Sequence, residues 1–60
     1  MKRTDKMVYI LENINANPID RRIMVDGNGK EFIKVNGQYV ELQWFYDSNY
    51  LVHTYEWEGR

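Results

Sequence analysis

The sequence predicts a small α+β domain in which one N-terminal helix packs on a four-stranded antiparallel β-meander. Two changes of pattern carry this prediction. Apolar residues in the segment 7–14 recur at helical spacing, whereas the segments after Pro18 alternate between apolar and polar residues as strands do. In addition, an Asn-Gly pair at positions 36 and 37 joins two alternating segments, which is typical of a tight β-hairpin.

The predicted helix covers residues 5–15. Its apolar stripe, with spacing i, i+3, i+4 and i+7, consists of Met7, Ile10, Leu11 and Ile14. Thr4 is a suitable N-cap and Asp5 is favourable in the first turn, while the Asn-rich stretch before Pro18 ends the helix. The alternative is a strand over residues 7–11, because the same residues form a short apolar run; the stripe and the cap favour the helix.

The predicted strands cover residues 22–25, 30–35, 38–46 and 50–57. Turn-forming clusters separate them at residues 26–29, 36–37 and 47–49. The sequence contains no internal repeat or low-complexity segment, so we expect residues 1–60 to form a single domain. A domain of this size buries only about 60% of its unfolded surface and has modest stability.

The Asn36-Gly37 pair also predicts the strand register. Both residue types tolerate the positive φ angles of a type I′ turn, and a two-residue loop places Ile33 opposite Val40. Because side chains alternate between the two faces of a strand, this register decides which residues share a face. Extending the register over the next loop pairs Trp44 with Val52.

One face of the predicted sheet is mostly aliphatic, and we take it as the core beneath the helix. It contains Met24, Ile33, Val35, Val40, Leu42, Trp44, Val52 and Thr54. Such a face is what one amphipathic helix can cover.

The opposite face is aromatic, which is unusual for the solvent side of a single sheet. Its candidate partner-binding residues are Phe32, Tyr39, Phe45, His53, Tyr55 and Trp57. Ile23, Val25 and Leu51 share this face with Lys30, Lys34, Glu41 and Gln43. Two alternatives remain open besides a register error. The sheet can curl toward a small barrel that buries the face, or a bulge at Gly27 or Gly29 can move Ile23 and Val25 to the other side.

Composition narrows the class of protein. The chain has 60 residues, no cysteine and a formal net charge of −1, with basic residues concentrated before residue 23 and acidic ones after it. Disulfides and thiolate metal sites are therefore excluded. No apolar run approaches the length of a membrane span, and no signal-peptide pattern is visible, so we expect a cytoplasmic protein with no membrane contact.

No motif names a reaction. Residues 26–28 match the start of a calcium loop, but Lys30 occupies the position of the next oxygen ligand. The single histidine, His53, and the single serine, Ser48, lie too far apart in the predicted hairpin for a catalytic pair. Nor do we expect a cavity for substrate chemistry, since the helix fills one side of the sheet. We therefore expect no enzyme, metal or cofactor.

The leading hypothesis is a small non-enzymatic protein-binding module. We expect the aromatic face to bind a larger protein, with the chain acting as an inhibitor or modulator. The same face could instead bind a second copy of the chain and form a homodimer. The abundance of Asn, Ile, Lys and Tyr suggests an AT-rich genome, which is consistent with a bacterial or phage origin. The alternative is a nucleic-acid-binding or transcription-modulating module, because Lys30 and Lys34 interleave with Phe32 and Tyr39; the acidic balance of this half disfavours it.

Overall fold

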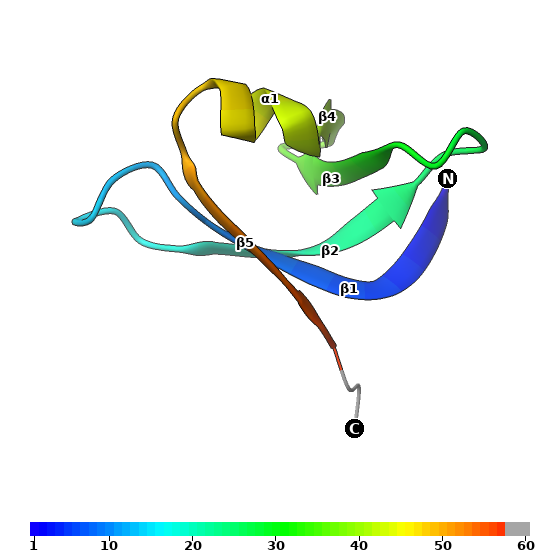
Figure 1. Ribbon diagram of the computed structural model, residues 1–60, viewed down its shortest axis with the longest axis horizontal. Helices are drawn as coiled ribbons and strands as arrows, with labels where there is room; N and C mark the ends of the chain where they lie inside the picture. The colour runs from blue at the N-terminus through cyan, green and yellow to red at the C-terminus, as the bar shows by residue number, and fades with distance from the viewer. Residues whose placement is uncertain (58–60) are drawn as a thin grey trace.

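Figure 1 shows a computed structural model of the chain, which describes residues 1–57. Within that range the elements are β1 (Lys2–Leu11), β2 (Ile19–Val25), β3 (Glu31–Val35), β4 (Gln38–Glu41), α1 (Leu42–Asp47) and β5 (Leu51–Glu56). All strand pairs are antiparallel, in the spatial order β4-β3-β2-β1-β5. The sheet is bent, and α1 lies over its hollow side (Figure 1). The two edge strands, β4 and β5, do not pair, so the sheet is not a closed barrel.

The prediction of an N-terminal helix is wrong. The segment from Lys2 to Leu11 is the interior strand β1, which pairs with β2 on one side and β5 on the other. Val8 and Ile10 are fully buried, whereas Tyr9 between them is exposed, so burial follows a period of two. The apolar run Met7–Leu11 fits both periods, and pairing on both edges satisfies its backbone better than an isolated helix can.

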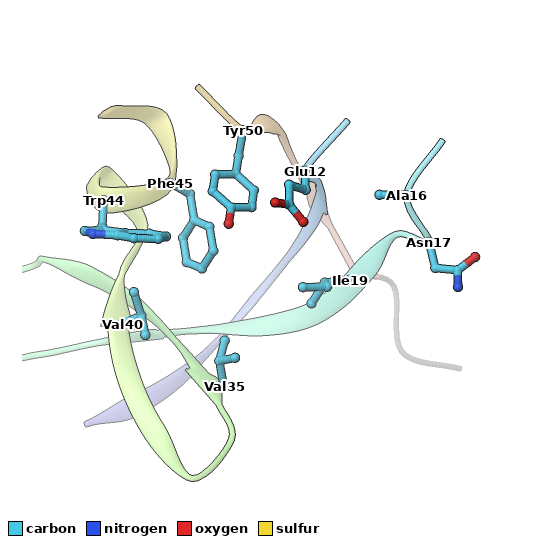
Figure 2. A pocket seen from close by; sticks show the side chains of 9 residues that line it. All are labelled: Glu12, Ala16, Asn17, Ile19, Val35, Val40, Trp44, Phe45 and Tyr50. Atoms are coloured by element: carbon cyan, nitrogen blue, oxygen red, sulfur yellow. The ribbon is translucent and has the colours of Figure 1, made fainter. Parts of the chain in front are cut away.

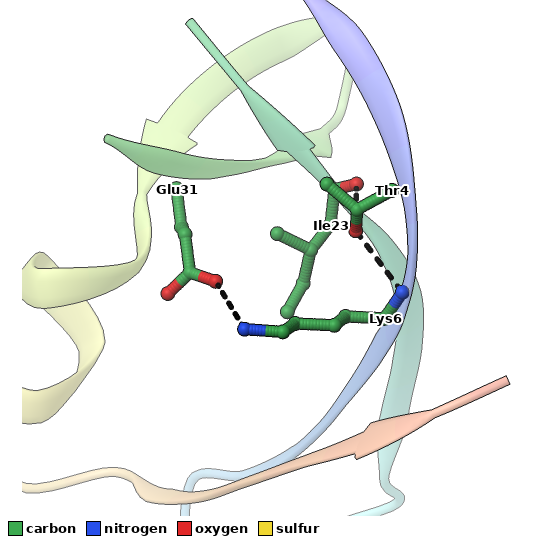
Figure 3. A network of polar contacts seen from close by, with 4 residues as sticks. All are labelled: Thr4, Lys6, Ile23 and Glu31. Carbon is green, nitrogen blue, oxygen red and sulfur yellow. Dashed lines mark hydrogen bonds and ion pairs between the residues drawn. The ribbon is translucent and has the colours of Figure 1, made fainter. Parts of the chain in front are cut away.

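Thr4, expected as a helix cap, instead stabilises a bulge in β1. Between the pairs Arg3–Met24 and Met7–Arg22 the register shifts, because β1 has extra residues there. The Thr4 hydroxyl accepts a hydrogen bond of 3.0 Å from the Lys6 N–H and donates one of 3.1 Å to the Ile23 carbonyl oxygen (Figure 3). Accepting an N–H two residues ahead is also what an N-cap does, so the local chemistry was the same in a different element.

The hairpin prediction is confirmed. Ile33 pairs with Val40 in the expected register, and Asn36 and Gly37 have φ angles of 53° and 82°. The preceding turn is also real: the Asp26 carboxylate accepts hydrogen bonds of 2.9 Å from the N–H groups of Asn28 and Lys30.

That preceding turn is longer than expected, and it inverts the faces of β2. Val25 pairs with Glu31, which leaves a connection of residues 26–30 where an even-length loop of residues 26–29 was expected. Ile23 is therefore fully buried in the core, and Met24 pairs with Phe32 on the other face. The prediction that Met24 belongs to the core face is wrong because one residue of loop length reverses every side chain of a strand.

The predicted strand over residues 38–46 is wrong beyond Glu41. Residues Leu42–Asp47 form α1, whose buried members, Leu42 and Phe45, are three residues apart. Trp44 is consequently 51% exposed instead of lying in the core, and it does not pair with Val52. No side chain caps the start of this short helix, so packing of its two apolar residues is what holds it.

The last strand, β5, pairs with β1 and not with the segment that precedes it in the chain. Tyr55 lies opposite Met7, and His53 lies opposite Tyr9. The first and last strands thus lie side by side, and the core forms between the bent sheet and α1. Its buried residues are Val8, Ile10, Ile23, Ile33, Leu42 and Phe45. Val35, Val40 and Val52 of the predicted core face are partly buried against it. In the described range, no helix is long and apolar enough to cross a membrane.

Candidate functional site

The sheet surface that faces away from α1 carries several aromatic side chains, and we call it the outer face. Strand alternation and the observed pairings assign to it Arg3, Met7, Tyr9, Leu11, Asp20, Arg22, Met24, Phe32, Lys34, Tyr39, Glu41, Leu51, His53, Tyr55 and Trp57. Four of its aromatic side chains are well exposed: Tyr9 by 37%, Tyr39 by 47%, Tyr55 by 36% and Trp57 by 47%.

Arg22 organises the part of the outer face formed by β1, β2 and the end of β5. Its guanidinium carbon lies 4.2 Å from the centre of the Trp57 ring, a cation–π contact. Its Nη1 donates a hydrogen bond of 2.6 Å to the Thr4 carbonyl oxygen in the β1 bulge. The backbone N–H of Trp57 donates a hydrogen bond to the Asp5 carbonyl oxygen of the same bulge. The bulge therefore positions both partners of the cation–π pair.

The Tyr55 side chain is hydrogen-bonded to a residue of β2. Its hydroxyl donates a hydrogen bond of 2.6 Å to Oδ1 of Asp20. This hydrogen bond, followed by partial desolvation and the charge of the Asp20 carboxylate, raises the pKa of Tyr55 above its ordinary value of 10.0. The His53 ring stacks on Tyr55 with a centroid distance of 6.4 Å and an angle of 16° between planes. Tyr55 and His53 thus present a pre-positioned pair of rings.

The other part of the outer face lies on the β3–β4 hairpin. Lys34 Nζ is 5.6 Å from the centre of the Tyr39 ring, directly across the hairpin. Half-buried Phe32 pairs with Met24 of β2 and Glu41 of β4. Because Met24 is two residues from Arg22 on the same strand, it links the two parts of the face.

Five of the six residues predicted from sequence lie on one face of the sheet, two of them on the β3–β4 hairpin and three at the opposite edge, on or after β5. Phe32, Tyr39, His53, Tyr55 and Trp57 all belong to the outer face. Their backbone pairings differ from the prediction for β5, which contacts β1.

Phe45 does not belong to the outer face. It is 5% exposed and packs edge-on against Trp44 and Tyr50, with centroid distances of 5.1 and 5.2 Å. Helix α1, where a strand was expected, turns its ring into the core. Tyr9 and Arg22 were missed as outer-face members; assigning residues 7–11 to a strand would have found Tyr9.

A second feature lies on the α1 side of the sheet. A hollow of about 460 Å³ opens there (Figure 2). It is lined by Glu12, Ala16, Asn17, Ile19, Val35, Val40, Trp44, Phe45 and Tyr50. The expectation of no sizeable cavity is wrong because α1 is one short helix and does not cover the whole sheet.

Residues 1–57 contain one histidine, His53, and one serine, Ser48. No group of three or more His, Asp or Glu side chains comes together there in a way that could hold a metal ion. His53 lies on the outer face, while Ser48 ends α1, and none of the hydrogen bonds in this range joins them. Comparison of the chain with protein-family models, with curated proteins and with solved structures finds no match.

Proposed function

We propose that this protein is a small non-enzymatic binding module that engages a larger protein through its outer face and acts as an inhibitor or modulator. The observation that carries the proposal is the exposure of Tyr9, Tyr39, Tyr55 and Trp57 on one face of the sheet. Contiguous exposed apolar surface is unusual on a monomer and marks interaction sites. Tyr and Trp are the residue types that most often dominate binding energy.

The side chains of this face are also held in place before a partner binds. Arg22 fixes Trp57, Asp20 fixes Tyr55, and Lys34 lies over Tyr39. A pre-organised aromatic side chain loses less rotational freedom on binding, so more of its burial contributes to affinity.

The charges of the outer face favour a protein over a nucleic acid. Arg3, Arg22 and Lys34 are nearly balanced by Asp20 and Glu41 on the same face, which leaves a formal excess of one positive charge. A surface that tracks a phosphate backbone needs a clear excess of positive charge. Nucleic-acid binding is the alternative function that the experiment below distinguishes from protein binding.

The test is affinity capture from the source cell with the tagged chain, followed by quantitative binding of the captured protein to variants. Tyr39→Ala and Trp57→Ala should each weaken binding by at least about thirtyfold, which is typical of an aromatic anchor. Tyr46→Ala is the matched control, because Tyr46 has the same 47% exposure as Tyr39 but lies on α1. Circular dichroism must show that all three variants fold.

Three outcomes contradict the proposal. One is an equal loss of affinity in the Tyr46→Ala control. Another is a dominant effect of Lys30→Ala and Lys34→Ala together with an affinity that falls steeply with salt, which is the signature of phosphate contacts. The third is unfolding of both aromatic variants, which would make the outer face a structural surface.

A further inference from the structure

We propose that the hollow on the α1 side is a binding site for a small organic cation, whose apolar body lies against the aromatic wall and whose charged group is held by Glu12. Three separate parts of the chain build this site. Glu12, Ala16 and Asn17 come from the connection between β1 and β2, Val35 and Val40 from the β3–β4 hairpin, and the rings from α1 and the start of β5 (Figure 2). Its volume of about 460 Å³ falls in the range of small-molecule sites, about 300–1,000 Å³.

One wall of the hollow is aromatic and well ordered. Trp44 and Tyr50 have a centroid distance of 5.7 Å, and Phe45 packs edge-on against both. Phe45 is anchored in the core, whereas Trp44 remains 51% exposed. The rings contact one another and leave no slot between them, so a ligand lies against this wall, with Ile19, Val35 and Val40 around it. A ligand of this site therefore has a mainly apolar body.

The charge of the lining residues indicates the charge of the ligand. Glu12 is the only lining residue with a charged side chain at neutral pH, and no Lys or Arg lines the hollow. In Figure 2 the Glu12 carboxylate points toward the space between Tyr50 and Ile19. Within residues 1–57, Glu12 forms no ion pair; the ion pair found there joins Lys6 and Glu31. An unpaired carboxylate at the rim of an apolar hollow attracts a cation.

This site is independent of the proposed function. None of the outer-face residues lines the hollow, and the sheet separates the two. Loss of partner binding through Tyr39 or Trp57 therefore leaves this inference untouched, and the reverse also holds.

The experiment is a methyl NMR titration of the full chain with two probes that share a phenyl ring and differ in charge: 2-phenylethylammonium and 3-phenylpropanoate. The ammonium probe should shift the methyl resonances of Ile19, Val35 and Val40, because a bound phenyl ring adds its ring current there. It should bind at least about tenfold more tightly than the carboxylate probe, which Glu12 repels. Methyl shifts of Met7 and Met24 on the outer face should stay small.

Two variants test the roles of charge and shape. Glu12→Gln keeps the shape and removes the charge, and should weaken the ammonium probe by about fivefold, the size of an exposed ion pair. Glu56→Gln is its matched control, since Glu56 is exposed but outside the hollow. Ala16→Leu, in the β1–β2 connection, should fill the hollow and abolish the shifts without entering the core.

The inference is overturned if the carboxylate probe binds as well as the ammonium probe, or if Glu12→Gln and Glu56→Gln behave alike. It is also overturned if neither probe shifts the three methyl groups at millimolar concentration. Retention of the shifts in a folded Ala16→Leu variant would place the probe elsewhere and would equally refute the site.

Discussion

Arg22 and Trp57 form a cation–π pair across β1, with 4.2 Å between the guanidinium carbon and the ring centre. Arg22 belongs to β2 and Trp57 follows β5, and these two strands flank β1. The pair meets where β1 bulges, and the Thr4 carbonyl oxygen of that bulge accepts a hydrogen bond from Arg22. One guanidinium thus connects three strands of the sheet.

Replacing Arg22 should therefore destabilise the fold. We expect Arg22→Met to lower the free energy of unfolding by about 1–3 kcal/mol, through loss of a charge-assisted hydrogen bond and the cation–π contact. Arg21→Met is the matched control, because Arg21 is exposed and the one hydrogen bond of its side chain within residues 1–57 goes to the adjacent Asp20 carbonyl oxygen, at 3.3 Å. Urea unfolding measures both. Equal effects of the two substitutions would contradict the structural role of Arg22.

The Tyr55–Asp20 hydrogen bond predicts a loss of stability at alkaline pH. The pKa of Tyr55 is raised in the folded state, so the folded chain holds this proton more tightly than the unfolded chain does. The stabilisation is fully present below the ordinary pKa of 10.0 and is lost as pH rises through the folded value. Urea unfolding of wild type and Tyr55→Phe between pH 9 and about 11 measures the difference. The gap between them should narrow as pH rises; a constant gap would show that the hydrogen bond does not favour the protonated phenol.

Truncation of Leu42 should be severe. Leu42 is 3% exposed and holds α1 to the core, so Leu42→Ala should cost about 2–5 kcal/mol. In a domain this small that is a large share of the total stability. Leu51→Ala is the control, with the same chemical change at a side chain that is 55% exposed. Thermal unfolding should show a large shift for the first variant and a small one for the second.

A side chain at position 37 of the Asn36-Gly37 turn should lower the stability of the fold. Gly37 has a φ of 82°, and Gly37→Ala should destabilise the chain by about 1–2 kcal/mol although a Cβ there meets no other atom within 4 Å. Gly27→Ala provides the comparison, since its Cβ also meets nothing and its φ is not in the left-handed region. Chemical unfolding that gives the two variants the same stability would contradict the turn assignment.

Self-association is a further expected property of the outer face. A second copy is the nearest partner for exposed aromatic surface, so we expect a homodimer at micromolar concentration. Sedimentation at several concentrations should show a species above 7.3 kDa that Tyr39→Ala and Trp57→Ala shift toward the monomer. A single 7.3 kDa species at every concentration would mean that the outer face does not pair with itself.

The β3–β4 hairpin is the part that the sequence alone determined, whereas the turn before it was recognised as a turn but was predicted one residue too short. The Asp26 carboxylate, the Asn36-Gly37 pair and the alternation around them act over a few residues, so the hairpin and its register follow from local chemistry. Alternation also placed Phe32 and Tyr39 on one face. His53, Tyr55 and Trp57 reached the same face because they alternate within their own strand, although that strand pairs elsewhere.

Tertiary structure decided the remainder. Residues 7–11 fit both a helix and a strand, and the local pattern favours the helix. The strand forms because β1 pairs with β2 on one side and, on the other, with β5, which is distant in sequence. Likewise, residues Leu42–Asp47 form a helix because this conformation lets Leu42 and Phe45 both pack into the core. The hollow beside Glu12 exists because three distant segments meet there. Local sequence patterns indicate turns and strand alternation. The pairing of the first strand with the last is stabilised by contacts between residues far apart in the chain, so it cannot be predicted from a local pattern.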